Sequence, residues 1–179
     1  MMTSLDGYFE GPNHDLSWHH TDDEFNDFAI KQTNEVGTIL FGRRTYEMMA
    51  GYWSQGGAYA ENPAEIVHQM NDTPKVVFSH SLSAATWSNT KLVSTGVAAF
   101  VRDLKKSAKK DLAIFGSNNL MVGLAELGLI DEFRIMLNPV AIGHGTSLFT
   151  GLTHPLDLRL ATTRAFKNGN LLLTYLPRA

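Results

Sequence analysis

The sequence predicts an α/β protein whose mainly parallel sheet finishes in an antiparallel pair of strands. Along most of the chain, a short apolar strand, a glycine turn and an amphipathic helix follow one another repeatedly. This order is typical of parallel sheets with crossover helices. The end of the chain instead alternates apolar and polar residues around Asn168-Gly169, which is a strong hairpin signal. We expect one domain over residues 1–179, because a chain of 179 residues with 44% hydrophobic residues can bury a core.

The first helix is expected to begin in the acidic cluster "TDDE". Thr21 suits the N-cap position, and Glu24 three residues later would complete a capping box. Apolar residues then recur at helical spacing until about Gly37. The later elements are predicted in this order: a strand at 38–42, a helix at 44–53, a loop at 51–62, a helix from 63 to about 70, strands at 75–79 and 91–94, a helix at 97–110, and a strand from 111 that leads through a glycine corner into a helix.

The composition argues against several classes of protein. A formal net charge of −3 gives no global attraction to nucleic acid or to an anionic membrane surface. No apolar run approaches the length of a membrane helix, and the first residues show no secretory signal. The absence of cysteine excludes disulfides, thiolate metal sites and cysteine nucleophiles, and it favours a cytoplasmic location. We therefore expect a small-molecule partner, bound at a local site.

Two arginines lie where the second helix is expected to begin, which is an unfavourable place for positive charge. A helix N-terminus carries roughly half a positive charge and unpaired N–H groups. Arg43 and Arg44 therefore indicate a negatively charged partner. Gly42 would let the backbone approach a phosphate closely, and Thr45 would supply a hydroxyl. The alternative for this corner alone is that a glycine ends a strand and the arginines lie on the surface.

A second strand-to-helix corner, "FGSNN", resembles the first in its chemistry. Its donors are neutral: Gly116, Ser117, Asn118 and Asn119. Because ligands in open α/β sheets bind beyond the carboxyl ends of the strands, we interpret the two corners as two walls of one phosphate site. Neither corner has the Walker A spacing, and the chain has no G-x-G-x-x-G motif.

A third corner follows the strand at 75–79. Ser79 and His80 could hold a ribose or an additional phosphate, although a polar turn after a buried strand would have the same composition.

Three carboxylates are candidates for catalysis. Asp22 and Asp23 could simply stabilise the first turn of a helix, but one of them could donate a proton if Trp18 desolvates it. Asp6 lies in an Asp-Gly turn and could instead contact a substrate or cofactor. We predict no metal site at His19, His20 and Glu24, because the chain has no His-x-x-x-His pair. A serine hydrolase is not expected either, since no G-x-S-x-G elbow occurs.

Four segments resemble, in order, the dihydrofolate reductase-like family that includes the reductase domain of bacterial riboflavin biosynthesis, the RibD C-terminal branch. They are "MTSLDGYFEGP", "ILFGRRTYEMM", "KVVFSHSL" and "AIFGSNNLMVGLAELGLIDEFRIMLNPVAIGHGTSLF", and together they span nearly the whole chain. The resemblance implies a single dihydrofolate reductase-like α/β domain with a mixed sheet flanked by helices. It also implies NADPH as the hydride donor and, often, a homodimer.

The resemblance also implies roles for individual residues. Gly42, Arg43, Arg44 and Thr45 match the segment that holds the NADPH phosphates. Ser79 and His80 match positions beside the adenosine 2′-phosphate, and Gly116 to Leu120 match the loop under the pyrophosphate. The stretch from Met2 to Gly11 resembles the loop over the nicotinamide. Asp23 is the position nearest to the acidic residue of the folate enzymes, with Asp22 as the alternate and Asp6 helping to shape the site.

The chain departs from the family pattern in three places. "GSNN" stands where folate reductases tend to have consecutive glycines, the first strand is expected to be short, and the 51–62 loop does not resemble a pterin-binding element. The expected function is therefore NADPH-dependent hydride transfer to a small heterocyclic or carbonyl substrate other than dihydrofolate. The alternative is a protein of the same fold that binds NADP without turnover, as a sensor or an assembly subunit.

Overall fold

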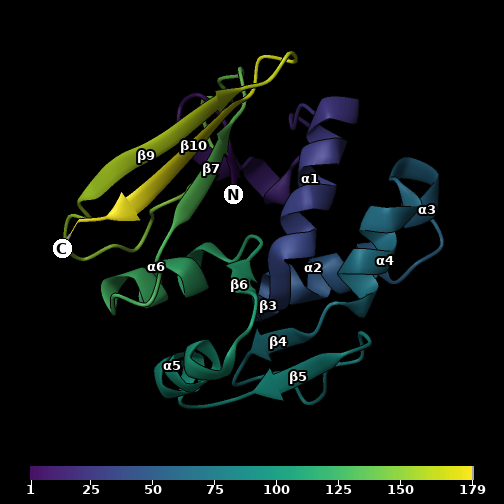
Figure 1. Cartoon of the computed structure of the whole chain (residues 1–179), viewed down its shortest axis with the longest axis vertical. Coiled ribbons are helices and arrows are strands. Elements are labelled where there is room, and N and C mark those ends of the chain that lie inside the picture. Colours follow the sequence, from purple (N-terminus) through teal and green to yellow (C-terminus); the bar gives the residue numbers. More distant parts are fainter. Residues whose placement is uncertain (179) are drawn as a thin grey trace. The chain divides into compact units, whose positions relative to one another are not determined.

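The computed structural model describes residues 1–178. In it, a parallel sheet is formed by short apolar runs, each of which ends near a glycine or a serine. The four strands are β3 (Val36–Gly42), β4 (Lys75–Phe78), β5 (Thr90–Val93) and β6 (Asp111–Ile114). They are hydrogen-bonded in the order β5-β4-β3-β6, and each neighbouring pair is parallel (Figure 1). The carboxyl ends of all four strands therefore lie at one edge of this sheet.

Helices cover both faces of the parallel sheet. They are α1 (Asp23–Glu35), α2 (Arg43–Trp53), the short α3 (Ala58–Glu61), α4 (Ala64–Asp72) and α5 (Val97–Ser107). Side chains alternate along a strand, so Val77 joins the core cluster that contains Tyr46 of α2 and Met70 of α4. The next residue, Phe78, contacts Phe100 of α5, with ring centroids 5.9 Å apart. Thus α2 and α4 cover one face, and α5 covers the other.

The chain divides into two compact units, and the parallel sheet belongs to the unit Asn26–Leu120. The other unit combines Met1–Phe25 with the chain from Met121 onward. Its larger sheet has the order β1-β7-β10-β9, formed by β1 (Met2–Thr3), β7 (Phe133–Leu137), β10 (Leu171–Pro177) and β9 (Leu158–Ala165). Its smaller sheet pairs β2 (Tyr8–Glu10) with β8 (Thr146–Ser147). A 3₁₀ turn, η1 (Pro12–His14), and helix α6 (Asn118–Glu126) complete the elements.

Most predicted elements are present. The hairpin at Asn168-Gly169 is confirmed, because β9 and β10 pair antiparallel and Gly169 has the positive φ of 90° that such a turn needs. The short first strand is also confirmed, since β1 has two residues. The antiparallel pair, however, belongs to the sheet that contains β7 and β1, where β10 is hydrogen-bonded to β7, and it is not part of the parallel sheet. The prediction of one domain over residues 1–179 stays a prediction.

Three local predictions were wrong. Asp22, not Thr21, caps α1, because its Oδ1 accepts the N–H of Phe25 at 2.8 Å. The loop predicted at 51–62 contains the last residues of α2 and all of α3. The strand predicted from residue 38 begins at Val36, directly after α1.

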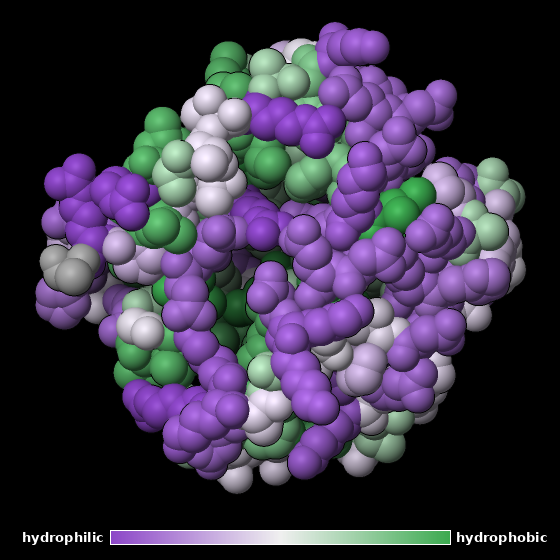
Figure 2. Space-filling model, viewed as in Figure 1, coloured by the Kyte–Doolittle hydropathy of each residue, from purple (hydrophilic) through white to green (hydrophobic). Residues whose placement is uncertain are grey.

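No helix within residues 1–178 is long and apolar enough to cross a membrane. The face of the molecule in Figure 2 is mostly hydrophilic, with hydrophobic residues gathered in separate patches.

Candidate functional site

The first two predicted corners contact each other at the carboxyl edge of the parallel sheet. They follow β3 and β6, which are neighbouring strands. The N–H of Gly42 donates a hydrogen bond to Oγ of Ser117 at 2.8 Å. A Cβ on Gly116 would lie only 2.8 Å from Cγ2 of Thr45, so glycine is needed for this close approach. Residues more than seventy positions apart in the sequence therefore form one continuous surface.

Two helices begin at this surface. α2 starts at Arg43 and α6 starts at Asn118, and neither helix has an acidic residue in its first turn. The N-cap of α2, Gly42, provides no side-chain hydrogen bond to the helix. Because the first N–H groups of a helix have no partner within the helix, both helix starts favour a negatively charged ligand.

The two arginines of the first corner have different surroundings. Nη1 of Arg43 lies 2.8 Å from Oε2 of Glu47, one turn later in α2, and both side chains are about half exposed. Arg43 and Arg44 were predicted to have a negatively charged partner, and for Arg43 that partner is in part Glu47, through an i, i+4 pair. Arg44 is exposed and forms no hydrogen bond or ion pair with another residue in the described part of the chain. Its guanidinium is the one in this corner that is free to bind an anion.

The third corner follows β4, the strand on the other side of β3. Ser79 is buried, and its Oγ accepts the N–H groups of Ser81 at 3.2 Å and Leu82 at 3.0 Å. This arrangement closes a tight turn, so the structure gives Ser79 a local role whether or not a ligand binds. His80 is exposed at the same edge of the sheet.

The predicted acids lie in the other unit and have unequal surroundings. Asp22 is the cap of α1, as described above. Asp23 is exposed, and Trp18 does not bury it, because the indole packs edge-on against His19 at 4.5 Å and donates to the carbonyl of Asp15. The desolvation by Trp18, on which the prediction of a proton donor at this helix start depended, is therefore not found for Asp23 in this structure.

Asp6 connects the turn after β1 to a distant loop. Its Oδ2 accepts the N–H of Gly143 at 2.8 Å, and its Oδ1 accepts the N–H of Ile142 at 3.2 Å. The Ser4 hydroxyl nearby, together with these two N–H groups, lowers the pKa of the carboxyl group. Both oxygens of Asp6 are thus engaged by the protein itself, which fits a shaping role better than direct contact with a substrate.

Asp6→Asn is expected to remove an acid-sensitive part of the stability. Because folding lowers the pKa of Asp6 below its ordinary 3.8, the carboxylate stabilises the fold above that pH, and this contribution is lost as the pH falls through the lowered pKa. In urea unfolding, wild type and Asp6→Asn should differ most near neutral pH and converge in acid. Asp27→Asn, at an exposed position of α1, is the control. A difference between wild type and Asp6→Asn that is independent of pH would contradict this account.

His19 and Glu24, two of the residues considered for a metal site, have different surroundings. Burial lowers the pKa of His19 to about 4, so its ring is neutral at pH 7. Glu24 accepts the N–H of Lys167 at 3.0 Å and Nη2 of Arg164 at 3.1 Å, contacts that hold the pKa of Glu24 below its usual value. Among residues 1–178, no group of three or more histidine, aspartate or glutamate side chains is arranged to hold a metal ion.

Lys75 is a residue whose importance the sequence did not indicate. It is buried at the start of β4, and its Nζ donates to the carbonyls of Met70, Asn71 and Thr73 at 2.7–2.9 Å. The ammonium also lies 4.5 Å from the centroid of the Trp87 ring. Burial lowers the pKa of Lys75 to about 8. The sequence offered one indication of a buried lysine, a charged residue directly before the apolar run "VVF". The same pattern is equally typical of an exposed residue at the start of a strand.

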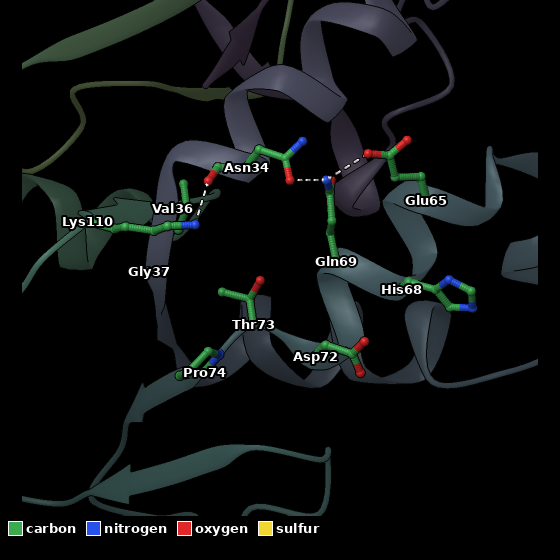
Figure 3. Close-up of a pocket in the computed structure, with 10 residues that line it drawn as sticks. All are labelled: Asn34, Val36, Gly37, Glu65, His68, Gln69, Asp72, Thr73, Pro74 and Lys110. Carbon is green, nitrogen blue, oxygen red and sulfur yellow. Dashed lines mark hydrogen bonds between the residues drawn. The ribbon is translucent and has the colours of Figure 1, made fainter.

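A groove lies away from these corners, at the amino-terminal edge of the parallel sheet (Figure 3). It has a volume of about 680 Å³ and is open to solvent. Its polar side chains largely satisfy one another: Lys110 Nζ donates to the carbonyl of Asn34 at 2.9 Å, and Gln69 Nε2 donates to Oδ1 of Asn34 at 2.8 Å. Ligands of open α/β sheets bind at the opposite edge, so we assign the site to the corners. The groove is lined by Asn34, Val36, Gly37, Glu65, His68, Gln69, Asp72, Thr73, Pro74 and Lys110.

Comparisons with known proteins agree with the predicted fold and family. A family model described as the RibD C-terminal domain matches residues 1–172. The uncharacterized protein YyaP of Bacillus subtilis (strain 168) is 29% identical over 180 residues, which cover 98% of this chain and 91% of that protein.

Solved structures with a similar fold support the same conclusion. A protein of Shewanella sp. PV-4 superimposes with a TM-score of 0.74 at 21% identity, covering 100% of this chain and 97% of that one. The diaminohydroxyphosphoribosylaminopyrimidine deaminase/5-amino-6-(5-phosphoribosylamino)uracil reductase of Thermotoga maritima gives 0.70 at 15% identity, covering 99% of this chain and 55% of that one. The predicted fold is therefore confirmed.

Proposed function

The chain belongs to the RibD C-terminal domain family, and from this we propose that it is an NADPH-dependent reductase of a small heterocyclic or carbonyl substrate. The observation that carries the proposal is the contact between the two corners, which sets the starts of α2 and α6 beside each other with no acidic residue in either first turn. A dinucleotide has a pyrophosphate to place there, and NADPH has a further 2′-phosphate.

The side chains present fit such a cofactor. The corners offer backbone N–H groups, the free guanidinium of Arg44, the Thr45 hydroxyl and the exposed amide of Asn119, whereas Asn118 is buried. These groups donate hydrogen bonds or carry positive charge, which is what phosphate oxygens require. In this proposal Gly42 to Thr45 and Gly116 to Leu120 hold the pyrophosphate, while Ser79 and His80 face the 2′-phosphate. NADPH supplies the hydride when it is bound, and the protein supplies orientation and exclusion of water.

Asp23 is our candidate for donating a proton to the substrate or orienting it. Of the three predicted acids it is the one whose carboxylate accepts no hydrogen bond from another residue in the described chain, whereas Asp22 and Asp6 are engaged. Asp23→Asn should therefore lower kcat by about 10²-fold or more, since general acid catalysis typically contributes about 10²–10⁴-fold, and leave the NADPH affinity unchanged. Unchanged turnover with cofactor bound would remove Asp23 from the mechanism.

A second candidate function is NADP binding without turnover. The exposure of Asp23 and the structural contacts of Asp22 and Asp6 favour it, because Asp23 lies in solvent and the other two carboxylates already accept hydrogen bonds from the protein. The discriminating experiment is NADPH oxidation against a panel of carbonyls, pterins, aminouracils and nitro compounds, followed by the loss of absorbance of the reduced nicotinamide. Oxidation that depends on one class of compound supports the reductase. Tight NADPH binding with no oxidation across the panel favours the binding protein.

We also propose a homodimer. The support is β9, an edge strand of eight residues that has β10 on one side only and is exposed along nearly its whole length. An exposed edge of this length is a natural place for pairing with a second chain. Sedimentation equilibrium tests this proposal, and a monomer at all concentrations would contradict it.

A further inference from the structure

Ser117 has an unusual backbone conformation for its residue type. Its φ of 63° lies in the left-handed region, and its side chain is buried, with 8% of the residue exposed. For a residue other than glycine this conformation has a steric cost, whereas glycine adopts it freely. We therefore expect the side chain of Ser117 to make a stabilising contact that glycine could not make.

The hydroxyl of Ser117 makes the contact that offsets this cost. Its Oγ accepts the N–H of Gly42, the residue that precedes α2, at 2.8 Å. The two corners pack closely here, because a Cβ on Gly42 would lie 3.4 Å from the same Oγ. The bond joins the corner after β6 to the corner after β3, and it also occupies the Gly42 N–H.

We propose that Ser117 is a positioning residue for the cofactor phosphates: its hydroxyl holds the Gly42–Thr45 corner against the Gly116–Leu120 corner before the ligand arrives. This inference rests on the proposed function. It assigns phosphate binding to groups other than the Gly42 N–H, namely the first N–H groups of α2 and α6 and the guanidinium of Arg44. If the two corners are already held together in the free protein, binding loses less conformational entropy, and the affinity for the ligand is higher.

The test compares Ser117→Ala, Ser117→Gly and the exposed control Ser107→Ala in three measurements. These are the affinity for NADPH, the affinity for adenosine 2′-monophosphate, which has no pyrophosphate, and stability in urea. Both Ser117 variants should bind NADPH about five- to tenfold more weakly, the loss expected for one hydrogen bond, and should bind adenosine 2′-monophosphate as wild type does. Ser117→Gly should be more stable than Ser117→Ala, because glycine accepts the positive φ.

Other results would overturn the inference. If Ser117→Gly binds NADPH as tightly as wild type, the hydroxyl does not position the site. If both ligands lose affinity equally, Ser117 has only a general structural role. Wild type that fails to bind NADPH would overturn the proposed function and this inference together, whereas wild-type binding with unaffected variants would overturn the inference alone.

Discussion

Lys75→Met is expected to lower the free energy of unfolding by about 2–4 kcal/mol, the largest loss of stability that we predict for a single substitution. Methionine keeps much of the volume of the lysine stem but leaves three carbonyl oxygens without their donor, those of Met70, Asn71 and Thr73. Two of these close the last turn of α4, and the third lies just before β4. The variant should therefore loosen the connection between helix and strand and also the packing against Trp87.

Urea unfolding of Lys75→Met measures this effect, with Lys109→Met, at an exposed position, as the control. The pH dependence gives a second check. The folded pKa of about 8 is below the ordinary 10.5, so between these values the unfolded chain binds more protons than the folded one. The stability of wild type should then rise with pH over that window relative to the variant. Equal stability losses for the two lysine variants would show that Lys75 does not have this role.

Arg44→Ala is expected to weaken NADPH binding by about 1.5–3 kcal/mol, which corresponds to about 10- to 150-fold. The reason is that Arg44 is exposed at the start of α2 with its guanidinium uncommitted, and a charged contact to phosphate is among the stronger hydrogen bonds.

Arg43→Ala provides a matched control, because it removes the same charge from the adjacent position. Arg43 already pairs with Glu47, so its removal should cost less affinity than removal of Arg44. Titrations followed by nicotinamide fluorescence measure both variants. A greater loss for Arg43→Ala than for Arg44→Ala would contradict this division of roles.

Much of the fold could be predicted because its signals are local. The apolar runs at β3, β4 and β6 and the Asn168-Gly169 turn are read from neighbouring residues. The cap of α1 was missed because Thr21 and Asp22 both have an oxygen suited to capping, and only the path of the backbone decides between them. A four-residue helix such as α3 is too short to show a periodic pattern.

The site was predictable only in part, because its decisive contacts are between distant residues or depend on burial. The bond from Gly42 to Ser117 exists because β3 and β6 are paired, which no local pattern shows. Outside the site, the buried amine of Lys75 is likewise a consequence of tertiary packing. The pair of Arg43 with Glu47 is different: its i, i+4 spacing was visible in the sequence and could have been used.

The central claim is that the joined corners bind the phosphates of NADPH, and the most direct test is to titrate the wild-type protein with NADPH and NADH side by side. We expect saturable binding of NADPH and weaker binding of NADH, because the 2′-phosphate gives NADPH additional negative charge and hydrogen-bond acceptors for this edge of the sheet. Binding of neither nucleotide, or equal binding of both, would contradict it.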